Sequence, residues 1–355
     1  MNSSDWRRLA LDPPRGIEPV AGRARLRASP EDFVVDEELG FAPGGAGSHL
    51  LLRVRKRGAN TGWVARELAG HAGVRAFEVG YAGLKDRNAV TTQWFTVPRG
   101  RRAPEDWQGV AGEGWEVLEA HLHGRKLPRG ALAGNRFRIV LRQFEGDRAR
   151  LEAHLDLIRA HGVPNYFGPQ RFGRELSNLV LLEGDATPAR EVRRGEESFV
   201  LSAARSLVFN AVLAARIANG TWNTLIAGER ANLDGRNSTF VVEAGDAALA
   251  ARLASFDIHP TGPLIGVGDS GVEGEIAVLE TQIAARYPIL VEYVNTAKVE
   301  AARRPLRVAV RDLAVEWLSD DACALQFTLR AGSFATSVVR ELVATDVAGA
   351  EEEHG

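Results

Sequence analysis

The chain of 355 residues lacks several features that mark secreted, membrane and metal-binding proteins. Its one cysteine, Cys323, excludes an internal disulfide and any cysteine-rich metal site. It has no run of about eighteen apolar residues, so we expect no membrane-spanning segment and no membrane partner. No apolar run follows the basic pair Arg7 and Arg8, which argues against a secretory signal. We therefore expect a protein of the cytoplasm.

An excess of charge of either sign is also missing. The 44 lysines and arginines and the 46 aspartates and glutamates give a formal net charge of −2, which argues against a protein that coats nucleic acid through bulk positive charge. Basic residues are nevertheless concentrated locally, and such clusters can supply contacts to RNA phosphates. The clusters lie at 23–27, 53–57, 99–102, 125–129 and 136–142.

Patterns for cofactor and metal sites are missing as well. No dinucleotide-binding glycine fingerprint occurs in the chain. Among the eight histidines, His121 and His123 lie close together, but no cysteine or acidic residue accompanies them at a typical ligand spacing. We therefore expect no metal ion and no nucleotide cofactor.

Strand patterns occupy both ends of the chain, and helical spacing predominates in the middle. The predicted strands cover 32–37, 48–56, 135–142, 307–310 and 324–330. The predicted helices cover 61–68, 147–161, 202–219, 247–256, 274–287 and 335–343. The predicted fold class is α+β, a mixed, largely antiparallel sheet flanked by helices, with a smaller α-rich domain inserted into it. The predicted domains are 1–160 plus 309–355, and the insertion 161–308.

One carboxylate, Asp86, lies in a short polar turn between two apolar, strand-like segments within residues 79–97. Lys85 precedes it and Arg87 follows it. A carboxylate held by strands and kept ionised by cations is a candidate nucleophile or base. Taken alone, a charged turn of this kind is more often plain solvated surface.

Four further segments accompany this turn in a consistent order. Together with the Asp86 turn at 81–91, they cover 30–35, 126–137, 163–173 and 331–342. In sequence, order and spacing the five segments resemble the TruD family of tRNA pseudouridine synthases, from about Arg23 to the end of the chain. The resemblance implies a catalytic domain of the pseudouridine-synthase type, an inserted family-specific domain and tRNA as the substrate.

The resemblance also implies the reaction, which is the isomerisation of a uridine in tRNA, at position 13 of the D-arm. The bond from N1 to C1′ breaks, the uracil turns, and C5 joins C1′. No redox step occurs and no group is imported, so no cofactor is expected. Asp86 corresponds to the catalytic aspartate, which either attacks C1′ or removes the C2′ proton. The sequence leaves both routes open.

Other site residues follow from the matched segments. Adjacent side chains of an extended segment point to opposite faces, so Arg27, just before the segment at 30–35, is our preferred cation for Asp86. The resemblance implies that Phe33, Asn135 and Phe334 contact the substrate, because aromatic rings stack on bases and an amide suits the uracil edge. Phe137, two residues beyond Asn135, could stack beside the flipped base.

Two other functions remain open from the sequence. One is a non-catalytic RNA-binding or RNA-folding protein on the same scaffold. The other is a glycoside hydrolase with a pair of carboxylates, in which Glu31 or Asp32 would have to face Asp86. The sequence does not determine the oligomeric state, and we expect a monomer.

Overall fold

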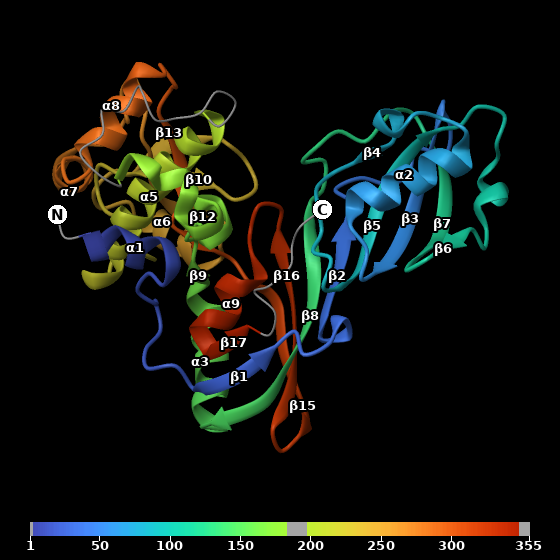
Figure 1. Cartoon of the computed structure of the whole chain (residues 1–355). Helices are drawn as coiled ribbons and strands as arrows, with labels where there is room; N and C mark the ends of the chain where they lie inside the picture. Colours follow the sequence, from blue (N-terminus) through green and yellow to red (C-terminus); the bar gives the residue numbers. More distant parts are fainter. Residues whose placement is uncertain (1–2, 183–196, 348–355) are drawn as a thin grey trace. The chain divides into compact units, whose positions relative to one another are not determined.

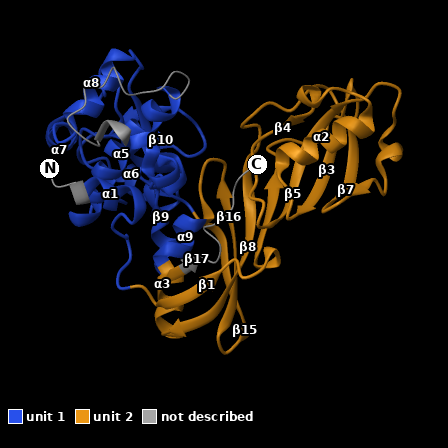
Figure 2. Ribbon diagram, in the orientation of Figure 1, with its two compact units in different colours: residues 1–19, 156–309, 336–341 blue, residues 20–155, 310–335, 342–355 orange. Residues whose placement is uncertain are grey.

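The computed structural model describes residues 3–182 and 197–347. It divides the chain into two compact units, each assembled from separate stretches of sequence (Figure 2). Unit 1 comprises residues 1–19, 156–309 and 336–341, and unit 2 comprises residues 20–155, 310–335 and 342–355. The described residues of the predicted insertion at 161–308 fall within unit 1, and the predicted domain boundaries themselves stay a prediction.

Unit 2 is built on one large mixed sheet, which Figure 1 shows. Its path runs β15-β16-β8-β2-β5-β3-β7-β6, and β1, β17 and β4 attach beside it. The strands are β1 (Gly22–Leu26), β2 (Phe33–Glu38), β3 (His49–Arg57), β4 (Gly80–Tyr81), β5 (Val90–Pro98), β6 (Ala111–Gly112), β7 (Trp115–His123), β8 (Gly134–Gly146), β15 (Arg311–Ser319), β16 (Ala322–Arg330) and β17 (Val343–Val347). Most pairs are antiparallel, whereas β2–β5 and β1–β17 are parallel. The α+β class with a largely antiparallel mixed sheet is therefore confirmed.

The long strand β8 organises this sheet. One edge pairs with β16, and the other pairs first with β2 and then, further along, with β1. Its first half alternates as the sequence predicts: Asn135, Phe137 and Ile139 are buried, whereas Arg136 is exposed and Arg138 half-buried. Period-two alternation places the buried side chains on one face of the sheet, and this is the face that carries the candidate site.

Helix α2 (Thr61–Ala72) covers the sheet where β3, β5 and β7 lie together (Figure 1). Its apolar residues Val64 and Leu68 pack in one core with Leu52 of β3 and Phe95 of β5. The helix ends at Gly73, whose φ of +71° is the left-handed conformation that glycine adopts without strain. Short 3₁₀ segments complete unit 2: η1 (Pro30–Asp32), η2 (Ala76–Glu78) and η3 (Pro104–Trp107).

Unit 1 packs helices around α5 and adds two small sheets. The four-stranded sheet has the order β11-β10-β12-β13, and β9 pairs with β14. The elements are α1 (Ser3–Leu11), β9 (Val163–Pro164), η4 (Pro169–Phe172), η5 (Arg174–Leu182), α5 (Glu197–Ala218), β10 (Arg230–Leu233), β11 (Thr239–Val241), α6 (Ala247–Ala254), β12 (Ile258–Leu264), α7 (Gly274–Ala284), α8 (Pro288–Thr296), β13 (Ala302–Pro305) and β14 (Arg307–Val308). Helices α3 (Arg148–His161) and α9 (Ala335–Leu342) contribute residues to both units.

Helix α5 forms the centre of unit 1. By length and composition alone it could cross a membrane, and 61% of its most apolar stretch is buried inside the structure. Its side chains Leu207, Val208 and Phe209 are fully buried in a core that also contains Trp222 and Leu290. A core helix of this kind passes the same compositional test as a membrane span.

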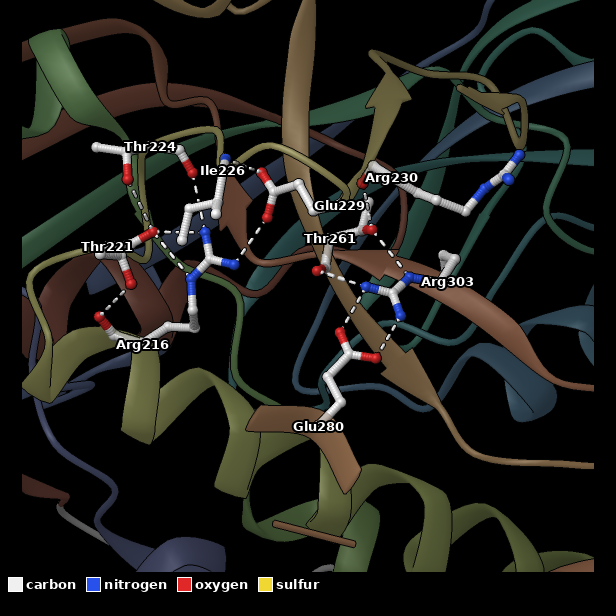
Figure 3. A network of polar contacts seen from close by, with 9 residues as sticks. All are labelled: Arg216, Thr221, Thr224, Ile226, Glu229, Arg230, Thr261, Glu280 and Arg303. Carbon is white, nitrogen blue, oxygen red and sulfur yellow. Dashed lines mark hydrogen bonds and ion pairs between the residues drawn. The ribbon is translucent and has the colours of Figure 1, made fainter. Parts of the chain in front are cut away.

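Two buried ion pairs lie beside the four-stranded sheet of unit 1 (Figure 3). Arg216 Nη1 lies 2.7 Å from Glu229 Oε2, and Arg303 Nη1 lies 2.7 Å from Glu280 Oε2. Backbone carbonyls and hydroxyls take the remaining donors, among them Thr221 O at 2.7 Å from Arg216 Nη2. Burial raises the pKa of Glu229, while the charge of Arg216 opposes that rise. The network joins α5, α7, β10, β12 and β13 through satisfied polar groups.

Several helices begin or end away from their predicted bounds, and one sheet was missed. Helix α5 begins at Glu197 rather than at 202, and the predicted helix at 274–287 is followed by a second one, α8. The predicted helical middle also contains the four-stranded sheet. The interpretation of the middle as helical was therefore incomplete, since strands alternate there with helices.

Candidate active site

The loop 82–89 that carries Asp86 lies between β4 and β5. Strands β2 and β5 are parallel neighbours, with Val34 opposite Val90. Because the amino ends of parallel neighbours meet at one edge of a sheet, residues that precede β2 and residues that precede β5 are brought together. Arg27 precedes β2, and Asp86 precedes β5.

Arg27 and Asp86 form an ion pair, through Nη2 of the arginine and Oδ2 of the carboxylate. The side chains are 19% and 35% exposed, so the pair is partly buried yet reachable from solvent. Arg27 adopts a left-handed backbone conformation, with φ of +58°, which turns the chain at the end of β1. Its Cζ lies 4.2 Å from the ring centroid of Phe33, and this cation–π contact helps to hold the guanidinium in place.

Side chains from two strands and a helix hold the backbone of this loop. Lys56 of β3 donates from Nζ to the carbonyl oxygens of Ala59, at 2.8 Å, and Asp86, at 2.9 Å. The hydroxyl of Thr61, at the start of α2, accepts from the Lys85 amide at 3.0 Å, and Gln93 Nε2 donates to the Gly83 carbonyl at 2.6 Å. These bonds fix the position of the carboxylate before any substrate binds.

The two basic neighbours of Asp86 point elsewhere. Lys85 Nζ lies 2.6 Å from Glu37 Oε1 in a buried ion pair, and Glu37 Oε2 also accepts from the Trp94 amide at 2.9 Å. Arg87 donates from Nε to the Gly58 carbonyl at 3.2 Å. Arg27 is therefore the cation that contacts the Asp86 carboxylate, as the side-chain directions of an extended segment predict.

Lys56 is a second cation behind the loop. Its side chain is completely buried, and burial is the largest influence on its pKa, which falls from 10.5 to about 8. The charge of Asp86 raises that pKa and the charge of Lys85 lowers it. The ammonium has backbone carbonyls as its hydrogen-bond acceptors, so it acts on the loop rather than directly on the Asp86 carboxylate.

Phe33 begins a row of aromatic rings on the same sheet face. The Phe33 and Phe137 centroids lie 6.3 Å apart in an edge-to-face arrangement, and Phe137 stacks on Phe327 at 5.4 Å. Phe137 is 6% exposed and Phe327 is 1% exposed. Phe137 is therefore a core ring between two others, and the suggestion that it could stack beside a base has no open ring face in this structure to support it.

Asn135 and Phe334 lie at the other end of β2 and β8. Asn135 pairs with Glu37 of β2 and with Leu329 of β16, and its buried Oδ1 has no hydrogen-bond partner among the described residues. Phe334 follows β16 and is 42% exposed. No hydrogen bond, ion pair or ring contact joins either residue to Asp86 within the described part of the chain. The structure therefore pairs Arg27 with Asp86 and places Asn135 on the same sheet face, without bringing all five predicted residues into contact.

The two carboxylates that a glycoside hydrolase could use opposite Asp86 have other partners. Asp32 is held by Arg142, whose Nη2 lies 2.7 Å from Oδ1, and Glu31 pairs with Arg57. Both carboxylates are thus engaged by cations other than Arg27. Within residues 3–182 and 197–347, no group of three histidine, cysteine or acidic side chains could hold a metal ion.

Comparison with protein families shows to which family the chain belongs. The family model "tRNA pseudouridine synthase D (TruD)" matches residues 18–189 and 176–342. The chain belongs to the TruD family. This is a family of tRNA pseudouridine synthases, which are isomerases.

Individual relatives agree with that assignment. The chain is 47% identical to a tRNA pseudouridine synthase D of Methylococcus capsulatus, covering 95% of this chain and 96% of that one. It is 43% identical to one of Xanthomonas euvesicatoria, covering 93% and 94%. A crystal structure titled as a putative tRNA pseudouridine synthase D (TruD) from Methanosarcina mazei has the same fold, with a TM-score of 0.77 at 21% identity over 95% of this chain and 97% of that one.

The residues that brace the Asp86 loop in this TruD family member were missed by sequence reasoning. The strand at 49–57 contained a signal for one of them. Leu52, Val54 and Lys56 occupy its inward positions, whereas Arg55 and Arg57 face solvent. A lysine at an inward position needs acceptors, and this pattern could have marked Lys56. Thr61 and Gln93 carried no such signal, because their partners depend on tertiary contacts.

Proposed function

We propose that this protein converts uridine to pseudouridine at position 13 of the tRNA D-arm, with Asp86 as the catalytic carboxylate and without a cofactor. The ion pair between Arg27 and Asp86 on a braced loop carries the proposal. Membership of the TruD family supports the reaction class. The position in tRNA is supported by the matched sequence segments.

The isomerisation needs one ionised carboxylate near the ribose. Asp86 either attacks C1′ or removes the C2′ proton, and both routes require an unprotonated oxygen. Arg27 pairs with Oδ2 and places a positive charge beside it, while Oδ1 has no hydrogen-bond partner among the described residues. In both routes the unengaged oxygen reacts, and Arg27 positions the carboxylate and stabilises its charge.

The target base must leave the RNA stack, at a cost of a few kcal/mol. We assign its binding to Phe33, Asn135 and Phe334. The unpaired, buried Oδ1 of Asn135 is an acceptor that suits the N3–H donor of uracil. Phe334 offers an exposed ring for stacking, while Phe33 is 3% exposed and contributes by holding Arg27, whose guanidinium lies against its ring. All of these residues, with Arg27 and Asp86, belong to unit 2, to which we assign catalysis.

The decisive experiment maps pseudouridine in unmodified tRNA transcripts, by carbodiimide labelling and primer extension, without added metal or cofactor. We expect a single new stop at position 13 with the wild type and none with Asp86→Asn. The amide keeps the shape of the side chain and removes the charge, so tRNA affinity should stay within a few-fold.

A matched control is Asp320→Asn, which makes the same change at a fully exposed carboxylate in the turn after β15. It should convert uridine as the wild type does. Substantial turnover by Asp86→Asn would rule out Asp86 as the nucleophile or base. Binding of tRNA without any product from the wild type would instead favour an RNA-binding or RNA-folding protein.

A further inference from the structure

Three arginines that lie around Phe167 and α5 in unit 1 have no carboxylate partner among the residues that the structure describes. They are Arg171 in η4, Arg205 in α5 and Arg304 in β13. Each is held by neutral groups only, so its positive charge is not compensated by those partners. An uncompensated, partly buried charge costs free energy, and this group therefore calls for an explanation.

Arg304 is the most constrained of the three. Its Nη2 donates to Asn165 Oδ1 at 2.6 Å, and its Cζ lies 4.1 Å from the ring centroid of Phe167 and 5.7 Å from that of Phe209. Its Nε is buried and has no hydrogen-bond partner in the described structure. The aromatic rings fix the plane of the guanidinium, and one of its donors remains unused.

Arg171 of η4 contacts the face of α5 on which Arg205 lies. Arg171 donates from Nη1 to the Ser202 hydroxyl at 2.9 Å, and its Cζ is 5.3 Å from the Phe167 centroid, the ring that Arg304 also contacts. Arg205, three residues after Ser202, donates from Nη2 to the Glu300 carbonyl at 2.9 Å. Residues three and four apart share one helix face, so Ser202, Arg205 and Phe209 bring the three guanidinium groups to one side of α5.

Other buried arginines of the same unit are treated differently. Arg216 and Arg303 each have a glutamate oxygen at 2.7 Å (Figure 3). Unit 1 therefore compensates some of its buried guanidinium groups with carboxylates, whereas Arg307 is held by backbone carbonyls and His259 Nδ1, and the arginines beside Phe167 have neutral partners. Burial and, to a smaller extent, the neighbouring charge of Arg171 together lower the pKa of Arg304 to about 10.

We propose that Arg171, Arg205 and Arg304 form a binding site for a backbone phosphate of the tRNA. The proposal rests on the proposed function, because it takes tRNA as the substrate. A phosphate supplies the missing negative charge to all three arginines. The planar, oriented guanidinium forks match phosphate oxygens, and the exposed Arg171 leaves the site open to solvent.

Salt dependence of tRNA binding tests this site directly. Each neutralised phosphate contributes about −0.9 to the slope of log affinity against log salt for duplex nucleic acid, and about −0.7 for single strands. We therefore expect Arg171→Gln combined with Arg304→Gln to reduce the slope by about one. The measurement is fluorescence anisotropy of a labelled, unmodified tRNA transcript between about 50 and 200 mM salt.

Two further variants control for nonspecific loss of charge and for misfolding. Arg252→Gln removes an arginine of unit 1 that also lies near a ring, 5.5 Å from the Phe240 centroid, but is paired with Asp257 at 2.6 Å. It should leave the slope unchanged. Arg171→Gln alone changes an exposed side chain, so it should fold even if the change at Arg304 destabilises unit 1, and it should weaken binding with a shallower slope.

Turnover separates this site from the catalytic centre. Arg171→Gln should raise KM and leave kcat unchanged, because the side chain binds the tRNA backbone and does not touch the uridine. Two results would overturn the phosphate site even if the wild type makes pseudouridine. One is a salt slope of the wild type that neither Arg171→Gln nor the double change alters. The other is an equal loss of slope in Arg252→Gln. A wild type that makes no product, with the expected slopes, would overturn the proposed function and support the phosphate site.

Discussion

Replacement of Lys56 by methionine should change how the stability of the protein depends on pH. The side chain is fully buried, and its pKa falls from 10.5 to about 8 on folding, mainly because burial disfavours the charged form. Methionine is similar in length and carries no charge, so the variant removes the titration and retains most of the apolar contacts of the side chain.

The size and sign follow from that pKa. The difference between 10.5 and about 8 corresponds to about 3 kcal/mol, at 1.36 kcal/mol per pKa unit. Between these two values the unfolded chain binds a proton at Lys56 that the folded chain does not bind, so the stability of the folded state rises with pH there. Below about pH 8 both states are protonated, and the full cost of charging the buried amine is present.

We therefore expect the free energy of unfolding of the wild type to gain about 3 kcal/mol relative to Lys56→Met between about pH 8 and pH 10.5. The measurement is urea unfolding of both proteins at a series of pH values, and the quantity of interest is the difference between them. Lys126→Met, at an exposed lysine that donates to the Phe77 carbonyl, is the matched control and should show no such trend. A difference between wild type and Lys56→Met that is constant across this range would refute the reasoning.

Three other changes have defined outcomes. Arg27→Met should slow pseudouridine formation, since it removes the cation that pairs with Asp86 and orients it; single-turnover rates would show this, and an unchanged rate would assign the role to another cation. Arg303→Met should lower the free energy of unfolding, measured in urea, by about 3–5 kcal/mol, because it leaves Glu280 buried and unpaired. Adding Glu280→Leu removes the second charge and should recover most of that loss. Equal losses in the single and the double variant would contradict this. Burial raises the pKa of Glu341 from 4.5 to about 7, so the wild type should lose about 3 kcal/mol of stability relative to Glu341→Gln as pH rises from 4.5 to 7, and parallel pH curves would argue against it.

Local patterns predict the parts of the fold in which neighbours in sequence decide the structure. The alternation of residues 135–139 predicts the buried and solvated faces of β8, and helical spacing predicts α3 to within a residue. The Asp86 turn between strands follows from the same reasoning. The ion pair with Arg27 needed one more step, since it depends on the side-chain directions of an extended segment.

The four-stranded sheet of unit 1 escapes such patterns for a physical reason. Strand β12 contains Pro260 and Pro263, which lack an amide donor and usually indicate that a segment is not an interior strand. In the fold, β12 nevertheless pairs on both edges, and the Pro260 carbonyl accepts from the Leu306 amide at 2.8 Å. Tertiary pairing therefore overrides local propensity in β12.

In the candidate site, too, local sequence predicts some residues and misses others. The matched segments predict Asp86, Phe33, Asn135 and Phe334, because the chemistry depends on residue type. The supports of the loop depend on register: Lys56 reaches the Asp86 carbonyl because β3 pairs with β5 so that Lys56 lies opposite Thr91. No local pattern contains that register, and the same reason explains why the alternation predicts the burial of Phe137 but not its two ring neighbours.

The pairing of β1 with β17 has a consequence for how the protein is made. Gly22 lies beside Val343, so the partner of one edge of β1 is translated more than three hundred residues after β1 itself. Strand β8 can pair with the other edge of β1 much earlier. Arg27, the cation for Asp86, directly follows β1, so the strand next to it gains its second neighbour late in synthesis. A nascent chain that stops before β17 contains every catalytic side chain but not the finished sheet that positions them.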